Sequence, residues 1–141
     1  MNYDNQSSAG GRSRTVPGMP RIDLVPLAVG GLRLASGVSF LVAPEKANRM
    51  WGDKEPPSPT AALLLRSMGY RDALVGGLLA SATLRGRPTR GWLLASAGAD
   101  AADLVGGMSV HRDLPRSQQV IGLGGAAVGI GIGLWGAFRR S

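Results

Sequence analysis

Residues 120–138 are the stretch of sequence that most constrains the fold. These nineteen residues include no charged side chain and a single hydrogen-bonding one, the indole of Trp135, and seven of them are glycine. In water each glycine costs a helix about 1 kcal/mol relative to alanine. In a bilayer the backbone has no water to bond to, so it forms a helix that satisfies its own hydrogen bonds. The stretch therefore predicts a membrane-spanning helix.

Three further segments have about the same length and are also largely apolar: 22–43, 60–84 and 91–110. Pro44 ends the first of them, and Pro59 precedes the second, where proline favours a helix start. The loops 85–90 and 111–119 are short, so the helices that they join must be antiparallel neighbours. The sequence thus predicts an all-α protein, an integral membrane four-helix antiparallel bundle over residues 22–138.

The chain ends and the composition exclude several kinds of site. Residues 1–21 contain too little apolar surface to fold, which predicts a disordered basic tail, and residues 139–141 form a basic C-terminal end. The sequence has no cysteine and one histidine, His111. Disulfides and thiolate metal sites are therefore excluded, and a haem or multi-histidine site is not expected. Since no catalytic motif is present either, we expect no catalytic residues, no metal and no cofactor, which argues against an enzyme.

The distribution of Lys and Arg predicts the orientation. With the N-terminus inside, the inner tails and loop carry eight of these residues and the outer loops carry five. Because positive charge is retained on the cytoplasmic side, we expect a multi-pass protein of the inner membrane with both termini in the cytoplasm. Arginines beside a span meet anionic lipid headgroups first, so we expect the lipid bilayer as partner and not a nucleic acid.

Six ionisable residues fall within the four segments: Arg33, Arg66, Arg71, Asp72, Asp100 and Asp103. Each costs about 2.5–3.5 kcal/mol near the bilayer centre. From the helical rise, five of them lie about 14–20 Å from the cytoplasmic side, whereas Arg66 lies at about 27 Å. Three positive and three negative charges balance, which favours a structural ion-pair network near the midplane. The alternative is a site at Asp100 and Asp103 that handles a proton, an ion or a polar ligand.

Small residues recur every four positions in two of the segments. Gly125, Gly129 and Gly133 form such a stripe in the fourth, and Gly69, Ala73, Gly77 and Ser81 form one in the second. Stripes of this kind let helix backbones approach closely. They predict helix packing within the bundle, or alternatively pairing with a second copy.

Several motifs resemble a family of small, uncharacterised bacterial membrane proteins, similar in layout to the DoxX-like group. The resemblance covers residues 22–138 and rests on Leu32–Gly37 with Ala43-Pro44, on Arg66–Gly77, and on the pair Asp100 and Asp103. Its most specific part is Gly69-x-Arg71-Asp72 with the later aspartates. The resemblance implies a four-helix membrane bundle without an established activity. Some DoxX-like relatives accompany quinone-linked or thiol-linked oxidoreductases, and this chain has no cysteine for the thiol-linked version.

Three functions remain open from the sequence. The first is a non-enzymatic subunit or scaffold that associates with another membrane protein or with itself. The second is a transporter or proton relay that uses Asp100 and Asp103. The third is a redox accessory protein with a quinone or lipid near Tyr70 and Trp92. The charge balance places the first ahead of the others.

Overall fold

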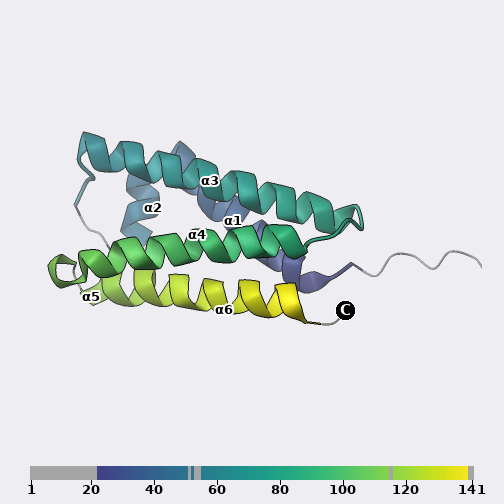
Figure 1. Ribbon diagram of the computed structural model, residues 1–141. Helices are drawn as coiled ribbons and strands as arrows, with labels where there is room; N and C mark the ends of the chain where they lie inside the picture. The colour runs from purple at the N-terminus through teal and green to yellow at the C-terminus, as the bar shows by residue number, and fades with distance from the viewer. Residues whose placement is uncertain (1–21, 51, 53–54, 115, 140–141) are drawn as a thin grey trace, which may run out of the picture.

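The computed structural model describes residues 22–50, 52, 55–114 and 116–139, and the described residues contain helices and no strand, which confirms the all-α class. The predicted tail 1–21 and residues 140–141 lie outside the described residues. The α-helices are α1 (Leu24–Val42), α2 (Pro44–Met50), α3 (Pro59–Leu84), α4 (Arg90–Ser109), α5 (Arg116–Gln118) and α6 (Gly124–Phe138). A 3₁₀ turn, η1 (His111–Asp113), follows α4, and a π-helical segment, η2 (Gln119–Leu123), leads into α6. Four long helices therefore occupy the four predicted segments and run side by side (Figure 1).

Local signals explain where these helices begin and end. The Asp23 side chain accepts a hydrogen bond from the Val25 amide at the start of α1. Ser58 does the same for Ala61 at the start of α3, where Pro59 takes the first helical position. Pro44 begins the short helix α2 immediately after α1 instead of starting a loop.

Helices α1 and α3 are packed backbone against backbone. A methyl group on Gly30 would lie 2.7 Å from the Ala80 nitrogen, and one on Gly69 would lie 2.7 Å from the Gly37 carbonyl oxygen. Gly76 faces α1 in the same way. Since real Cβ atoms do not approach other atoms this closely, only glycine at these positions permits the observed distance between the two helices.

Helices α4 and α6 form the second close pair. A methyl group on Gly133 would lie 2.9 Å from the Ala97 Cβ atom, and one on Gly136 would lie 3.3 Å from Leu93. The two pairs meet near the turn between α3 and α4, where Leu79, Leu93 and Ala137 form a buried cluster. The fold is thus two helix pairs whose apolar contact is buried at this end.

An ion pair ties the start of the first long helix to the end of the last. The Arg139 guanidinium donates a hydrogen bond to the Asp23 carboxylate, so the two ends of the described chain lie together (Figure 1). This hydrogen bond holds the pKa of Asp23 below its ordinary value. Arg139 also lies over the Trp135 ring, 4.9 Å from its centroid.

Two of the described helical stretches are long and apolar enough on their own to cross a membrane: Leu24–Val42 and Gln119–Phe138. Little of either is buried inside the protein, 22% of the first and 17% of the second. Helices α3 and α4 have the length, but the charged residues in their middle turns lower their hydropathy. By composition alone, then, two of the four predicted spans qualify.

Candidate functional site

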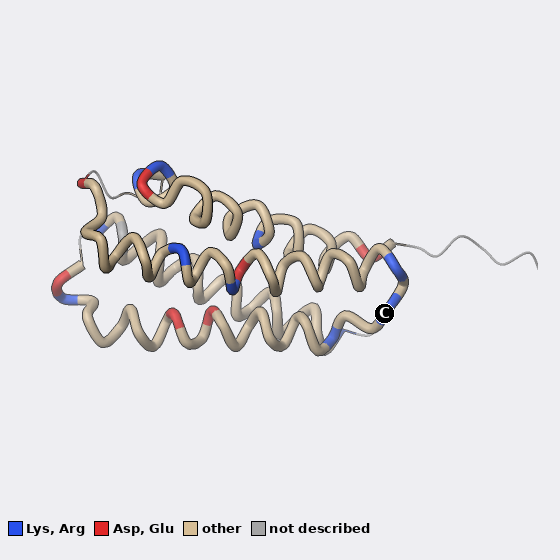
Figure 2. The backbone as a smooth tube through the Cα atoms, turned by 90° about the horizontal axis from the view of Figure 1, so that it is seen from above, with Lys and Arg blue, Asp and Glu red and all other residues tan. Residues whose placement is uncertain are grey.

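The ionisable residues inside the long helices gather at mid-length. Figure 2 shows charges at both ends of the long helices and a separate group between the ends. Arg33 belongs to α1, Arg71 and Asp72 to α3, and Asp100 and Asp103 to α4. Three helices therefore contribute to one polar group within an otherwise apolar stretch.

Arg33 is the most enclosed member of this group, with 11% of its side chain exposed. Its guanidinium donates to Asp72 Oδ1 at 2.7 Å, to the Ser96 carbonyl at 3.1 Å, and to Asp100 Oδ1. The absence of a side chain at Gly76 leaves room for Arg33 between the closely packed helices α1 and α3, because a Cβ atom there would lie 2.8 Å from the Arg33 Cβ atom. Arg33 thus links α1 to both α3 and α4.

Arg71 makes the second link between α3 and α4. Its terminal nitrogens Nη1 and Nη2 donate to the two oxygens of Asp103 at 2.9 and 2.7 Å, a bidentate pair. Its Nε and Nη2 atoms each lie 3.3 Å from Asp72 Oδ1. The result is one continuous row, Asp100, Arg33, Asp72, Arg71 and Asp103, which we call the ion-pair row.

Arg66 lies outside the ion-pair row. Its side chain is exposed, and none of the ion pairs among the described residues includes it. Depth accounts for this, since Arg66 is five residues before Arg71 on α3, about 7.5 Å nearer the start of the helix. The balance of three charges against three predicted from the sequence therefore does not describe the group: two arginines meet three aspartates, an excess of one carboxylate.

A cleft of about 910 Å³ lies between the two helix pairs, and the ion-pair row forms part of its wall. Arg33, Asp72, Asp100 and Asp103 all line it. The rest of the lining is mostly apolar, with Phe40, Met68, Val128 and Ile132 among the larger side chains. The sequence does not predict this cleft, because periodicity identifies helix faces and not the spacing between separate helix pairs.

The two predicted small-residue stripes lie differently from each other. On α6, Gly133 packs on α4, Gly129 faces the Asp100 carboxylate, and Gly125 is exposed and lines the cleft. Of these three glycines, Gly133 is the one that packs against the backbone of another helix. Gly129 instead leaves the space that the Asp100 carboxylate occupies.

On α3, the stripe that faces α1 is Gly69, Ala73, Gly76 and Ala80, and not the predicted Gly69, Ala73, Gly77 and Ser81. The reason is geometric. A step of four residues advances the helix by about 40° beyond a full turn, so a strict four-residue stripe drifts away from its partner. A step of seven returns to within about 20° of the starting direction.

The predicted neighbours Tyr70 and Trp92 do not share a site. Tyr70 is 61% exposed and does not line the cleft. Trp92 lines a smaller pocket at the turn between α3 and α4. Within the described part of the chain, no three His, Cys, Asp or Glu side chains are grouped so that they could hold a metal ion.

These features define a class: a small all-helical protein in which a row of arginines and aspartates joins two glycine-packed helix pairs. Over residues 30–138 the chain matches a domain of unknown function, DUF4267, and it belongs to that family. No match was found among the curated proteins or among the solved structures. Membership of an uncharacterised family is thus confirmed, and the matched range includes the whole ion-pair row. The likeness to DoxX-like proteins and a bacterial source stay predictions.

Proposed function

We propose that this DUF4267 protein is a multi-pass integral membrane protein, without enzymatic activity, that binds lipophilic cations in the cleft between its helix pairs. The outer faces of all four long helices support insertion. Each helix carries large apolar side chains that are more than half exposed and do not line the cleft, for example Leu24, Leu64, Val105 and Phe138. Apolar surface of this extent on every side is the pattern of a protein surrounded by lipid.

The charged residues at the two ends of the helices support insertion in an inner membrane with both termini in the cytoplasm. The end that holds the α3–α4 turn carries Arg85, Arg87, Arg90 and Arg139. Among the described residues Asp23 is the acid at this end. The opposite end mixes both signs, with Glu45, Glu55 and Asp113 beside its basic residues. Because loops rich in Lys and Arg stay on the cytoplasmic side of the membrane, the turn between α3 and α4 is expected in the cytoplasm.

Cysteine labelling tests this orientation, and the chain itself offers a clean background because it has no cysteine. In intact cells, Ser58→Cys is expected to react with an impermeant thiol reagent, and Arg87→Cys is expected to react only after the membrane is permeabilised. The measurement is the fraction of each variant that is labelled before and after permeabilisation. Labelling of Arg87→Cys in intact cells would reverse the orientation, and recovery of the chain in the soluble fraction would overturn insertion.

The observation that carries the binding function is the excess carboxylate on an apolar cleft. Asp72 and Asp100 both accept their arginine hydrogen bonds on Oδ1. The side chain of Asp100 lines the cleft, with its carboxylate packed against Gly129. An unbalanced negative charge in low dielectric attracts a positive charge strongly. Apolar walls around it favour a cation that carries its own apolar body.

The same imbalance bears on the other functions. A network that served only to fix helix packing would be most stable with its charges balanced, so the excess carboxylate favours a ligand over a purely structural role. A proton could also neutralise the excess charge, which keeps the proton relay as the competing possibility. A redox accessory role has less support, because the cleft is not lined by Tyr70 or Trp92.

The proposal is tested with two ions of the same shape and opposite charge. Tetraphenylphosphonium and tetraphenylborate have nearly the same size and apolar surface but opposite charge. The purified protein in lipid nanodiscs is expected to bind the cation and not the anion. Asp100→Asn is expected to weaken cation binding by about tenfold or more, since a charge-assisted contact is worth about 1.5–3 kcal/mol. Calorimetry or equilibrium dialysis measures both constants.

Asp113→Asn provides the matched control, because it removes a carboxylate from the exposed turn η1 that does not line the cleft. Its cation binding should equal that of the unmodified protein. Unfolding temperatures of both variants show whether either has lost its fold. Equal binding of the two tetraphenyl ions, or the same affinity in Asp100→Asn and Asp113→Asn, would refute the proposal. A cation affinity that falls steeply as pH is lowered would show that a proton competes for the same charge.

A further inference from the structure

The turn between α3 and α4 holds two arginines in a fixed relation. Gly86 has a φ of 62°, the left-handed conformation that glycine adopts readily. Its amide donates to the Thr83 carbonyl at 3.1 Å, and the Arg87 amide donates to the Ala82 carbonyl at 2.9 Å. These two bonds form the glycine-based motif that commonly ends helices. The motif places Arg85 and Arg87 on either side of Gly86.

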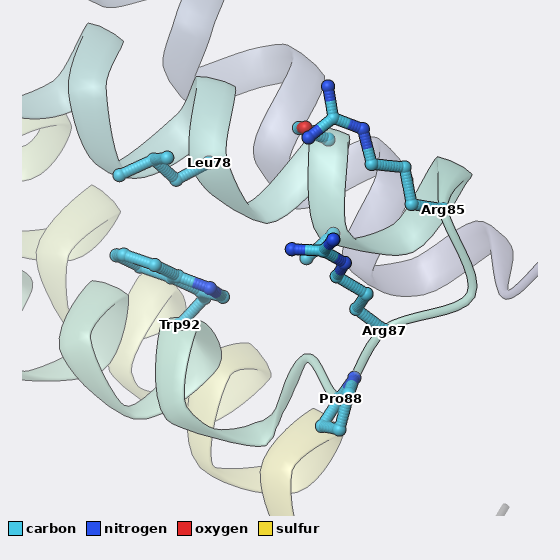
Figure 3. Close-up of a pocket in the computed structure, with 7 residues that line it drawn as sticks. Leu78, Arg85, Arg87, Pro88 and Trp92 are labelled. Atoms are coloured by element: carbon cyan, nitrogen blue, oxygen red, sulfur yellow. The ribbon is translucent and has the colours of Figure 1, made fainter.

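The two arginine side chains line a pocket of about 260 Å³. In Figure 3 both extend back from the turn along the helices, toward the region where Leu78 and Trp92 face each other across the gap between α3 and α4. An arginine that only sought water would point beyond the end of the helices. The other residues that line the pocket are mostly apolar: Leu78, Ala82, Pro88 and Trp92, with Ser81 as the polar one.

The positive charge of the pocket is not neutralised within the described part of the chain. The ion pairs there include neither Arg85 nor Arg87. Asp23, the described acid at this end, is paired with Arg139. Arg90 adds a further positive charge nearby and lies over the Phe138 ring, 4.9 Å from its centroid. The pocket therefore attracts an anion.

We propose that this pocket binds the phosphate headgroup of an anionic phospholipid, whose acyl chain lies along Leu78 and Trp92. The proposal rests on the membrane insertion proposed above. Guanidinium groups match phosphate oxygens in two-pronged hydrogen bonds. The turn lies at the end of the long helices, which is headgroup depth, and tryptophan favours that depth because its ring is apolar with one polar edge. A soluble phosphate would satisfy the arginines but would leave the apolar wall uncovered.

Lipid retention by the full chain tests the proposal. The protein is reconstituted in nanodiscs that contain equal amounts of phosphatidylglycerol and phosphatidylcholine, and the lipids that stay bound after release are identified by native mass spectrometry. We expect phosphatidylglycerol to be retained. The double variant Arg85→Gln/Arg87→Gln is expected to reduce its retention by about tenfold or more, because the loss of a single charge-assisted contact already corresponds to that factor.

Arg112→Gln/Arg116→Gln is the matched control, because it removes the same charge from the opposite end of the helices. It should retain phosphatidylglycerol as the unmodified protein does. Equal loss in the two double variants would mean attraction by net charge alone, and equal retention of both lipids by the unmodified protein would mean no site. Displacement of the lipid by an equal concentration of glycerol phosphate would make the pocket a site for soluble anions. Each of these results overturns the lipid site while insertion stands, whereas recovery of the chain in the soluble fraction overturns both.

Discussion

Arg33→Ala is expected to lower the free energy of unfolding by about 3–5 kcal/mol, the usual cost of leaving a buried charge without its partner. The guanidinium of Arg33 bonds to Asp72, Asp100 and the Ser96 carbonyl. Its loss leaves the Asp100 carboxylate without its arginine donor and leaves Asp72 with only the longer bonds from Arg71. The measurement is reversible unfolding of the purified protein in mixed detergent micelles, followed by its helical circular dichroism signal.

Arg66→Ala is the matched control for that experiment. It removes the same side chain from an exposed position outside the ion-pair row, where substitutions cost about 0.5 kcal/mol or less. Arg33→Ala combined with Asp100→Asn should regain part of the lost stability, because it removes the negative charge that Arg33→Ala leaves without an arginine donor. If Arg33→Ala costs no more than Arg66→Ala, the ion-pair row does not hold the helix pairs together.

Gly37→Leu is expected to have a comparable or larger effect, through packing and not through charge. A side chain at Gly37 would overlap the α3 backbone at Ala73 and Gly69. Because backbone cannot move aside as a flexible side chain can, α1 and α3 would have to separate, with a cost of about 3 kcal/mol or more. The yield of folded protein in membranes and the unfolding temperature of the purified protein report the loss.

Gly31→Leu is the control on the same helix. A methyl group on Gly31 would meet no atom of the described residues within 4 Å. Leucine is also the better helix former by several tenths of a kcal/mol, so this variant should be as stable as the original or more so. Equal destabilisation by the two variants would mean that the close packing of α1 on α3 does not contribute to stability.

The ends of α1, α3 and α4 could be predicted from the sequence to within two residues, because Pro59 and the turn around Gly86 are strong local signals. The start of α6 could not, because the π-helical segment η2 precedes it and α6 begins only at Gly124, whereas the predicted segment begins at residue 120. Which helices pack most closely could not be predicted. That depends on the distance between backbones at Gly30, Gly37, Gly69 and Gly76, and similar glycines occur in α6 without such a contact. Pairing is a property of two helix surfaces together, whereas periodicity describes each surface alone.

The residues of the candidate site could be predicted from the sequence, but the net charge of the group that they form could not. Depth along each helix places Arg33, Arg71 and the three aspartates in one layer, and the same estimate sets Arg66 apart. The excess carboxylate follows only once Arg66 is left out of the sum. The cleft that the excess carboxylate faces depends on the spacing between the two helix pairs. No local sequence pattern determines that spacing.

The arrangement of close contacts restricts how this molecule can move. Backbone packing within each helix pair resists sliding or bending, so each pair behaves as a rigid body. The pairs meet at the cluster of Leu79, Leu93 and Ala137, beside the α3–α4 turn. Rotation of the two pairs about that end is therefore the change in cleft width that disturbs the buried apolar packing least. The hydrogen bonds from Arg33 and Arg71 to α4 connect the two pairs across the cleft and oppose its widening. A cation that draws Asp100 away from Arg33 would break one of these connections as it binds.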